Sequence, residues 1–346
     1  MPKKFKIVAD ESIPFLQGVL DPYADIVFMK GREICRDDLI DADALMIRTR
    51  TRCDASLLEG TKVSIIATAT IGTDHIDFDY CKSRSIEVHN ASGCNAGGVM
   101  QYVFSALYGV AAHKGIGLDG KTFGIIGVGN VGKRVEAMAE YLGFKVLRCD
   151  PPRAETEGGD AFCSLEYLLE HSDIVSLHTP LNDSTRLMAD ETFFMKMKSE
   201  AVFINAARGE IVDEKALVEV APKFAAIVID TWNNEPDINT ALMDIADIAT
   251  PHIAGYTYQG KMNGTSMAVQ AVARRFGIYQ LYDFYPTQLP QDVPQKLELQ
   301  GKSQGEIAAT FQYNYPVFTD DFMFRMNPGD FERLRQDYCY RREIYI

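Results

Sequence analysis

The stretch Thr122-Phe123-Gly124-Ile125-Ile126-Gly127-Val128-Gly129-Asn130-Val131-Gly132 decides how this chain folds. It begins with an apolar run typical of a buried strand, and three glycines in the pattern G-x-G-x-x-G follow directly. A helical pattern continues from 131 to 142, and a second strand pattern, 145–149, ends at Asp150. Strand, glycine-rich turn, helix, strand and acid in this order predict a dinucleotide-binding βαβ unit.

Each glycine of this turn, which we call the glycine loop (Gly127–Gly132), has its own physical role. Gly127 permits the tight turn, and Gly129 lets the backbone approach a pyrophosphate at the helix N-terminus. Gly132 lets the helix pack closely on the strand. Asn130 and Val131 stand between these glycines, so we predict that they line the same cofactor site.

Asp150 indicates which dinucleotide binds. Its carboxylate can accept hydrogen bonds from the adenosine ribose hydroxyls, and its charge would repel a 2′-phosphate. The sequence therefore predicts NAD in preference to NADP. Arg148 and Arg153 lie close by in the chain and would act against that preference.

The composition excludes several classes of partner. The 346 residues carry a net charge of −13, which argues against nucleic acid and against an anionic membrane surface, although a local arginine cluster can still bind a small anion. The seven cysteines form no C-x-x-C pair, so we predict no metal site and a reducing, cytoplasmic location. No apolar run approaches membrane-spanning length.

Short apolar runs alternate with helical patterns along most of the chain, which predicts an α/β protein with largely parallel sheets. We expect two Rossmann-like/flavodoxin-like parallel-sheet domains and a small α+β C-terminal dimerisation module. The domains are predicted as 1–95 with 254–285 for substrate, 96–253 for NAD, and 286–346 for dimerisation. The strands are expected at 6–9, 44–47, 64–67 and 86–89, then at 122–126, 145–149, 174–177, 202–205, 225–229 and 248–249, and helices at 96–113 and 258–281. Pro286, Pro290 and Pro294 indicate a linker, and the last module is expected to hold a strand at 296–299 and a charged helix at 330–346.

Three later strand ends carry polar residues that together fit one reaction. Arg208 can clamp a carboxylate with two hydrogen bonds, His252 can act as a base near neutral pH, and Glu235 can orient the imidazole. Taken singly, each has a plainer interpretation, namely a solvated arginine, a surface glutamate and a structural histidine. Together they supply the base and the cation that oxidation of a 2-hydroxy acid requires.

Arg48 and Thr49 follow another predicted strand and therefore lie at the ligand-binding edge of the first sheet. A positive charge at this place in an acidic chain suits an anionic substrate. A phosphate held by these residues would explain this charge. That the partner is a small phosphorylated 2-hydroxy acid is what the resemblance of the chain to a known family implies.

The glycine loop, Ala207-Arg208-Gly209, Glu235-Pro236 and Pro251-His252-Ile253-Ala254-Gly255 resemble the D-isomer-specific 2-hydroxyacid dehydrogenases over about residues 1–280. The resemblance implies NAD-dependent oxidation of a D-2-hydroxy acid by a homodimer, with Arg208, Glu235 and His252 as catalytic residues. It implies substrate contacts at Thr49, Thr70 and Tyr256, and cofactor contacts at Asp150, Thr179, Ala206, Asp230 and Gly255. Thr179 and Asp230 also stand at predicted strand ends, where NAD is expected.

Two alternatives remain open from the sequence. One is a related enzyme that oxidises another D-2-hydroxy acid, such as 3-phosphoglycerate. The other is a non-enzymatic NAD-sensing binding protein of the same fold, which would need a partner-binding surface that the sequence does not reveal.

Overall fold

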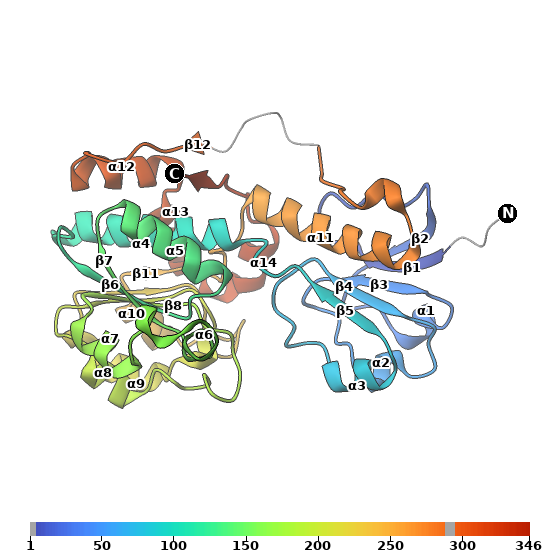
Figure 1. Ribbon diagram of the computed structural model, residues 1–346, viewed down its shortest axis with the longest axis horizontal. Coiled ribbons are helices and arrows are strands. Elements are labelled where there is room, and N and C mark those ends of the chain that lie inside the picture. The colour runs from blue at the N-terminus through green and yellow to red at the C-terminus, as the bar shows by residue number, and fades with distance from the viewer. Residues whose placement is uncertain (1–4, 288–294) are drawn as a thin grey trace. The chain divides into compact units, whose positions relative to one another are not determined.

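The structure, a computed structural model, describes residues 5–287 and 295–346 (Figure 1). Its contacts group the chain into two units. The first unit comprises Met1–Asn95 and Tyr258–Val293, and the second comprises Ala96–Thr257 and Pro294–Ile346. The predicted return of the chain to the N-terminal domain near residue 254 therefore occurs at Tyr258. The last segment groups with the second unit, and its role as a dimerisation domain stays a prediction. The predicted linker prolines Pro290 and Pro294 lie outside the described residues.

The first unit is built on a five-stranded parallel sheet in the order β2-β1-β3-β4-β5, the flavodoxin-like order. Helix α11 packs on one face, and short helices cover the other (Figure 1). The alternation of β1 explains this, because Ile7 and Ala9 join the α11 core while Val8 joins the opposite core. The elements are β1 (Phe5–Asp10), β2 (Ala24–Met29), α1 (Arg36–Leu39), β3 (Ala44–Ile47), α2 (Ala55–Leu58), β4 (Ile65–Thr68), α3 (Phe78–Ser83), β5 (Glu87–Asn90), α11 (Tyr258–Phe276) and the 3-10 helix η4 (Tyr279–Leu281).

The second unit contains a six-stranded parallel sheet in the order β11-β10-β9-β8-β6-β7. The strand order reverses between β6 and β8, so the ligand crevice of such a sheet lies at the end of β6, where the glycine loop stands. The elements are α4 (Ala96–Lys114), β6 (Thr122–Ile126), α5 (Asn130–Tyr141), β7 (Lys145–Cys149), α6 (Pro151–Glu157), η1 (Gly159–Ala161), α7 (Leu165–His171), β8 (Ile174–Leu177), α8 (Glu191–Lys196), β9 (Val202–Asn205), η2 (Gly209–Ile211), α9 (Glu214–Val220), η3 (Ala221–Lys223), β10 (Ala226–Ile229), α10 (Thr240–Ile245) and β11 (Ile248–Ala249).

The C-terminal segment extends the core of the second unit. Phe311 of α12 packs against Phe104 and Tyr108 of α4, with ring centroids 6.2 and 5.5 Å apart. Asp321 of α13 accepts a hydrogen bond from the backbone N–H of Ala249 at 2.7 Å, which satisfies the free edge of β11. The elements of this segment are β12 (Gln295–Lys296), α12 (Gln304–Asn314), α13 (Val317–Met326), η5 (Pro328–Asp330), α14 (Phe331–Gln336) and β13 (Ile344–Tyr345).

Most predicted strands are confirmed to within a residue, but four expectations were wrong. Strand β2 was missed, because it is an edge strand whose side chains are mostly half-exposed. The helix expected at 258–281 ends at Phe276, where Gly277 adopts a φ of +70°. The strand expected at 296–299 is only Gln295–Lys296. The charged helix expected at 330–346 is the single short helix α14, followed by β13.

Within the described ranges, no helix is long and apolar enough to cross a membrane. The 19-residue helix α4 is apolar because most of its side chains are buried in the core of the second unit.

The glycine loop yields a matched pair of substitutions. A Cβ at Gly132 would collide with the carbonyl oxygen of Gly127, whereas a Cβ at Gly129 has no described heavy atom within 4 Å. Gly132→Ala should therefore lower the free energy of unfolding by about 1–3 kcal/mol, and Gly129→Ala should leave it within about 0.5 kcal/mol. Chemical denaturation measures both changes. Gly129→Ala should instead weaken NAD binding, measured by calorimetry, because its methyl group fills the approach to the backbone. Equal stability of the two variants would contradict this account.

Candidate active site

Arg208, Glu235 and His252 follow three adjacent parallel strands, β9, β10 and β11. Because the carboxyl ends of parallel strands share one edge of the sheet, all three residues belong to one edge of the second unit. The structure thus brings together at this edge the three residues that the sequence singled out for catalysis.

His252 and Glu235 form a hydrogen-bonded pair. The Nδ1 atom of His252 lies 3.0 Å from Oε1 and 2.9 Å from Oε2 of Glu235, and both side chains are partly exposed. A proton on Nδ1 donates to this carboxylate, which leaves Nε2 available to accept a proton from a ligand. The backbone N–H of Trp232 also donates to Oε1 of Glu235 at 3.1 Å, so the carboxylate is held in place.

Glu235 stays ionised in this setting. Burial would raise its pKa, but the charge and hydrogen bond of His252, and then the charge of Arg335, lower it, and the net direction is downward. An ionised Glu235 can stabilise the imidazolium that forms when His252 accepts a proton. The pair therefore has the arrangement of a general base with its orienting carboxylate.

Asp230 holds the backbone that presents His252. Its side chain is fully buried and accepts hydrogen bonds from the Thr250 hydroxyl at 2.7 Å, the Ile253 N–H at 2.9 Å and the Ala254 N–H at 3.0 Å. Its carbonyl accepts from the His252 N–H at 2.8 Å. His252 itself has a φ of +55°, a left-handed conformation that surrounding contacts must maintain. Asp230, predicted as a cofactor contact, is thus placed as the anchor of the loop 250–254.

The position of Arg208 depends on its neighbour Gly209. A Cβ at Gly209 would collide with the backbone of Trp232, so only glycine allows the turns after β9 and β10 to lie this close. Asn205 fixes the same turn, donating from Nδ2 to the Arg208 carbonyl at 3.0 Å and accepting from the Ala207 N–H at 3.0 Å. The Arg208 guanidinium is partly exposed and donates to the Ala207 carbonyl at 2.8 Å.

The glycine loop fits a dinucleotide. Gly127 has a φ of +86° and lies against the backbone of His178 and Thr179, at the point where the strand order reverses. Gly129 and Asn130 are exposed at the start of the 12-residue helix α5, whose N–H groups suit a pyrophosphate. The Thr179 hydroxyl is buried with no hydrogen-bond partner among the described residues, as expected of a group that a ligand satisfies. Val131 and Ala206 are partly buried and pack against the same hydrophobic core of the second unit, and Gly255 is buried.

Asp150 ends β7 and caps helix α6. Its carboxylate accepts from the Val128 N–H at 2.8 Å and from the Arg153 N–H at 3.1 Å, which ties it to the glycine loop. The two arginines that could favour a 2′-phosphate already have acidic partners. Arg153 pairs with Glu157, and Arg148 pairs with Glu136 and Glu140. The charge balance around Asp150 therefore favours NAD over NADP.

In the first unit, Arg48 and Thr49 follow β3, and Thr70 follows the neighbouring strand β4. These three predicted substrate contacts thus belong to the carboxyl edge of one sheet. Arg48 Nη1 donates to the Ser12 carbonyl at 3.1 Å, and the Thr70 hydroxyl lies 2.7 Å from that of Thr68. Thr49 is exposed and borders a hollow of about 580 Å³, whose charged lining residues are Arg52, Asp54, Asp74 and Asp77.

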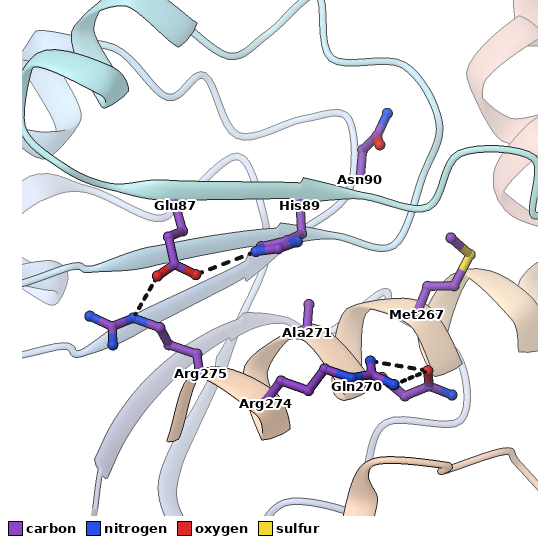
Figure 2. Close-up of a pocket in the computed structure, with 8 residues that line it drawn as sticks. All are labelled: Glu87, His89, Asn90, Met267, Gln270, Ala271, Arg274 and Arg275. Atoms are coloured by element: carbon purple, nitrogen blue, oxygen red, sulfur yellow. Dashed lines mark hydrogen bonds and ion pairs between the residues drawn. The ribbon is translucent and has the colours of Figure 1, made fainter. Parts of the chain in front are cut away.

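A second groove of the first unit, of about 550 Å³, lies between β5 and α11 (Figure 2). Its charged side chains are already satisfied, since Arg275 and His89 both lie beside Glu87, at 3.3 and 3.4 Å, and Arg274 donates to Gln270 (Figure 2). The groove contains none of the predicted site residues, so we assign it no chemistry.

Tyr256, the remaining predicted substrate contact, belongs to the second unit and packs against the C-terminal segment. Its ring centroid lies 5.9 Å from that of Tyr338 and 5.8 Å from Cζ of Arg335. The same segment supports the loop that follows His252. Arg341, which is almost fully buried, donates to the carbonyls of Ile253 at 3.1 Å, Gly98 at 3.1 Å and Ala254. The sequence interpretation placed both arginines in a charged helix at 330–346 and assigned neither of them a contact with the catalytic residues.

Comparison with known proteins agrees with this geometry. Residues 105–254 match the family model of the D-isomer specific 2-hydroxyacid dehydrogenase NAD binding domain. The chain is 41% identical to erythronate-4-phosphate dehydrogenase of Bacteroides fragilis, over 98% of this chain and 97% of that protein. It is 40% identical to the enzyme of that name from Yersinia pestis, over 98% and 92%. The chain belongs to the D-isomer-specific 2-hydroxyacid dehydrogenase family.

Solved structures of dehydrogenases from this family share the fold. A 3-phosphoglycerate dehydrogenase of Entamoeba histolytica bound to NAD⁺ gives a TM-score of 0.67 at 27% identity, covering 79% of this chain and 96% of that one. A D-lactate dehydrogenase of Aquifex aeolicus in complex with NAD and lactic acid gives 0.67 at 26% identity, covering 83% and 100%. The two predicted parallel-sheet α/β domains, the NAD cofactor and the assignment as an NAD-dependent D-2-hydroxyacid dehydrogenase are confirmed, while the C-terminal dimerisation module stays a prediction.

The cofactor preference of this dehydrogenase can be tested at Asp150. Asp150→Ser keeps an N-cap acceptor for α6 but removes the charge, so the ratio of kcat/KM with NADP to that with NAD should rise about tenfold or more. Asp190→Ser makes the same change at the N-cap of α8 and should leave the ratio unaltered. If the unsubstituted protein uses both cofactors equally well, Arg148 or Arg153 governs the choice instead.

Proposed function

We propose that this dehydrogenase oxidises 4-phospho-D-erythronate to 3-hydroxy-2-oxo-4-phosphooxybutanoate, a step of pyridoxal phosphate biosynthesis. The observation that carries the proposal is the His252–Glu235 pair, which shares one sheet edge with Arg208, in a chain about 40% identical to proteins named erythronate-4-phosphate dehydrogenase. The names belong to the relatives, and their high coverage of this chain supports the same substrate here.

Each of the three catalytic residues has a separate role in the proposed reaction. His252 Nε2 takes the proton of the C2 hydroxyl, and the ionised Glu235 stabilises the imidazolium that results. Arg208 donates hydrogen bonds to the substrate carboxylate and so fixes C2. NAD, when bound, supplies the acceptor for the hydride that leaves C2. The glycine loop, Asp150 and Thr179 would hold that cofactor, with Ala206 and Gly255 at the same sheet edge.

The further substrate contacts that we propose are Arg48, Thr49 and Thr70 of the first unit and Tyr256 of the second. A four-carbon acid with a terminal phosphate carries two anionic groups, which require two separate cationic sites. Arg208 serves the carboxylate, and we assign the phosphate to Arg48 with Thr49, because both follow β3 at the carboxyl edge of its sheet.

The decisive test follows NADH formation with 4-phosphoerythronate. His252→Gln should lower kcat by about 10²–10⁴ because the general base is lost, while NAD affinity stays near that of the unsubstituted protein. D-3-phosphoglycerate and an unphosphorylated 2-hydroxy acid serve as comparison substrates. Higher kcat/KM with either would favour the alternative enzyme, and NAD binding without turnover of any substrate would favour the NAD-sensing protein. Near-normal turnover by the His252 variant would rule out its role as base.

We also propose that the protein is a homodimer formed through its C-terminal segment. Large apolar side chains on α12 and α13 are exposed there, with Tyr313 at 85%, Phe322 at 60% and Met326 at 64%. Several large exposed apolar side chains on neighbouring helices are typical of a surface that another subunit covers. A cytoplasmic location is part of the same proposal, and it is supported by the seven cysteines, none of which forms a disulfide.

Charged substitutions test the dimer. Phe322→Glu combined with Met326→Glu should halve the mass measured by light scattering, because the two carboxylates would be buried without partners at the interface. Tyr279→Glu, which alters a 74% exposed aromatic of the first unit, is the matched control and should leave the mass unchanged. An unchanged mass for the double variant would place the interface elsewhere.

A further inference from the structure

Helix α14 of the C-terminal segment brings a second cation to the catalytic pair. Nη1 of Arg335 lies 3.8 Å from Oε2 of Glu235, the same oxygen that lies 2.9 Å from Nδ1 of His252. The Arg335 side chain is only 17% exposed, whereas Arg333, two residues earlier in the same helix, is 58% exposed and pairs with Asp330. Glu235 therefore lies between the His252 imidazole and the Arg335 guanidinium, two side chains that are 83 positions apart in the sequence.

Packing fixes the position of Arg335. Its Cζ lies 5.5 Å from the ring centroid of Phe331 and 5.8 Å from that of Tyr256. Phe331 is fully buried against Phe324, which packs in turn against Trp232. Because the Trp232 N–H donates to Glu235, one aromatic stack sets the position of both the carboxylate and the arginine.

Burying an arginine side chain costs free energy, so the position of Arg335 requires an explanation. Nε of Arg335 is buried without a hydrogen-bond partner among the described residues, so the side chain bears a desolvation cost at this place. Burial would lower the pKa of Arg335, yet Tyr256 and Glu235 raise it, and the guanidinium remains charged beside the carboxylate. An ordinary structural ion pair on the surface would bear no such cost.

We propose that Arg335 is a positioning residue of the active site, which holds the Glu235 carboxylate in the orientation that supports His252. The proposal rests on the proposed function, in which His252 is the base. It gives the C-terminal segment a catalytic role within its own subunit, in addition to the proposed role in dimer formation.

The titratable and charged groups around His252 and Glu235 determine the expected pH effect. His252 lies near the carboxylates of Asp230 and Glu235, and Glu235 lies near His252 and Arg335. Arg335 in turn lies near Tyr256, Glu235 and Glu332. Removing the positive charge of Arg335 leaves the negative groups in excess around the imidazole. Protonated His252 is then stabilised, so the base is lost to protonation at a higher pH than before.

The test compares Arg335→Met with Arg333→Met. Arg335→Met keeps the apolar contact with Phe331 but removes the charge, and it should move the acid limb of the kcat/KM profile upward by about half to one pH unit. We expect kcat to fall about tenfold, with NAD affinity unchanged. Arg333→Met should leave both quantities as they are, and Arg335→Lys should restore much of the original profile because it restores the charge.

A second readout needs no turnover. NMR titration of the His252 imidazole in the free protein, assigned with His252→Gln, should move to higher pH in Arg335→Met and not in Arg333→Met. This result would support the coupling even if 4-phosphoerythronate proved to be the wrong substrate. The same titration in both variants, or an Arg335→Lys protein that titrates like Arg335→Met, would overturn the proposal. If Arg335→Met does not fold, Arg335→Gln takes its place in the same measurements.

Discussion

The buried carboxylate of Asp230 is the constraint on which the active site depends. It stands at the end of β10, accepts two backbone N–H groups and a hydroxyl from the loop after β11, and thereby presents His252 in a left-handed conformation. Burial raises the pKa of Asp230, an effect that the positive charge of His252 and these hydrogen bonds oppose. A carboxylate buried this deeply needs such donors, so the hydrogen bonds to Asp230 tie the catalytic loop to the end of β10.

Two further contacts connect Arg208 and Glu235 to this edge of the sheet. Gly209 lets the turn bearing Arg208 approach the backbone of Trp232, and Trp232 donates to Glu235, which holds His252. The three predicted catalytic residues, spaced over more than forty positions, are therefore linked by backbone contacts between neighbouring strands. Membership of the D-isomer-specific 2-hydroxyacid dehydrogenase family is consistent with this arrangement and with the NAD-binding glycine loop.

The local sequence pattern was sufficient to predict most of the fold and the polar residues at the sheet edges. Buried parallel strands such as β6, β8 and β9 are apolar runs bounded by polar residues, so their limits can be read directly. The edge strand β2 was not predicted, because its half-exposed residues do not form an apolar run that differs clearly from its polar flanks. Arg335 and Arg341 could not be recognised, because a buried arginine differs from a surface one only through acceptors that lie far away in the sequence. The same holds for Asp230, whose loop-anchoring bonds exist only after β10 and β11 have paired.

The hydrogen bonds that Arg341 donates to backbone carbonyls have a consequence for synthesis of the chain. Its guanidinium donates to the carbonyl of Ile253, 88 positions earlier, and to that of Gly98, 243 positions earlier. Contacts of such long sequence separation form late in folding. On the ribosome, the loop carrying His252 emerges well before the arginine that holds it. The nucleotide-binding sheet can therefore assemble while translation continues, but the catalytic loop acquires its final support only when the chain has been made as far as Arg341.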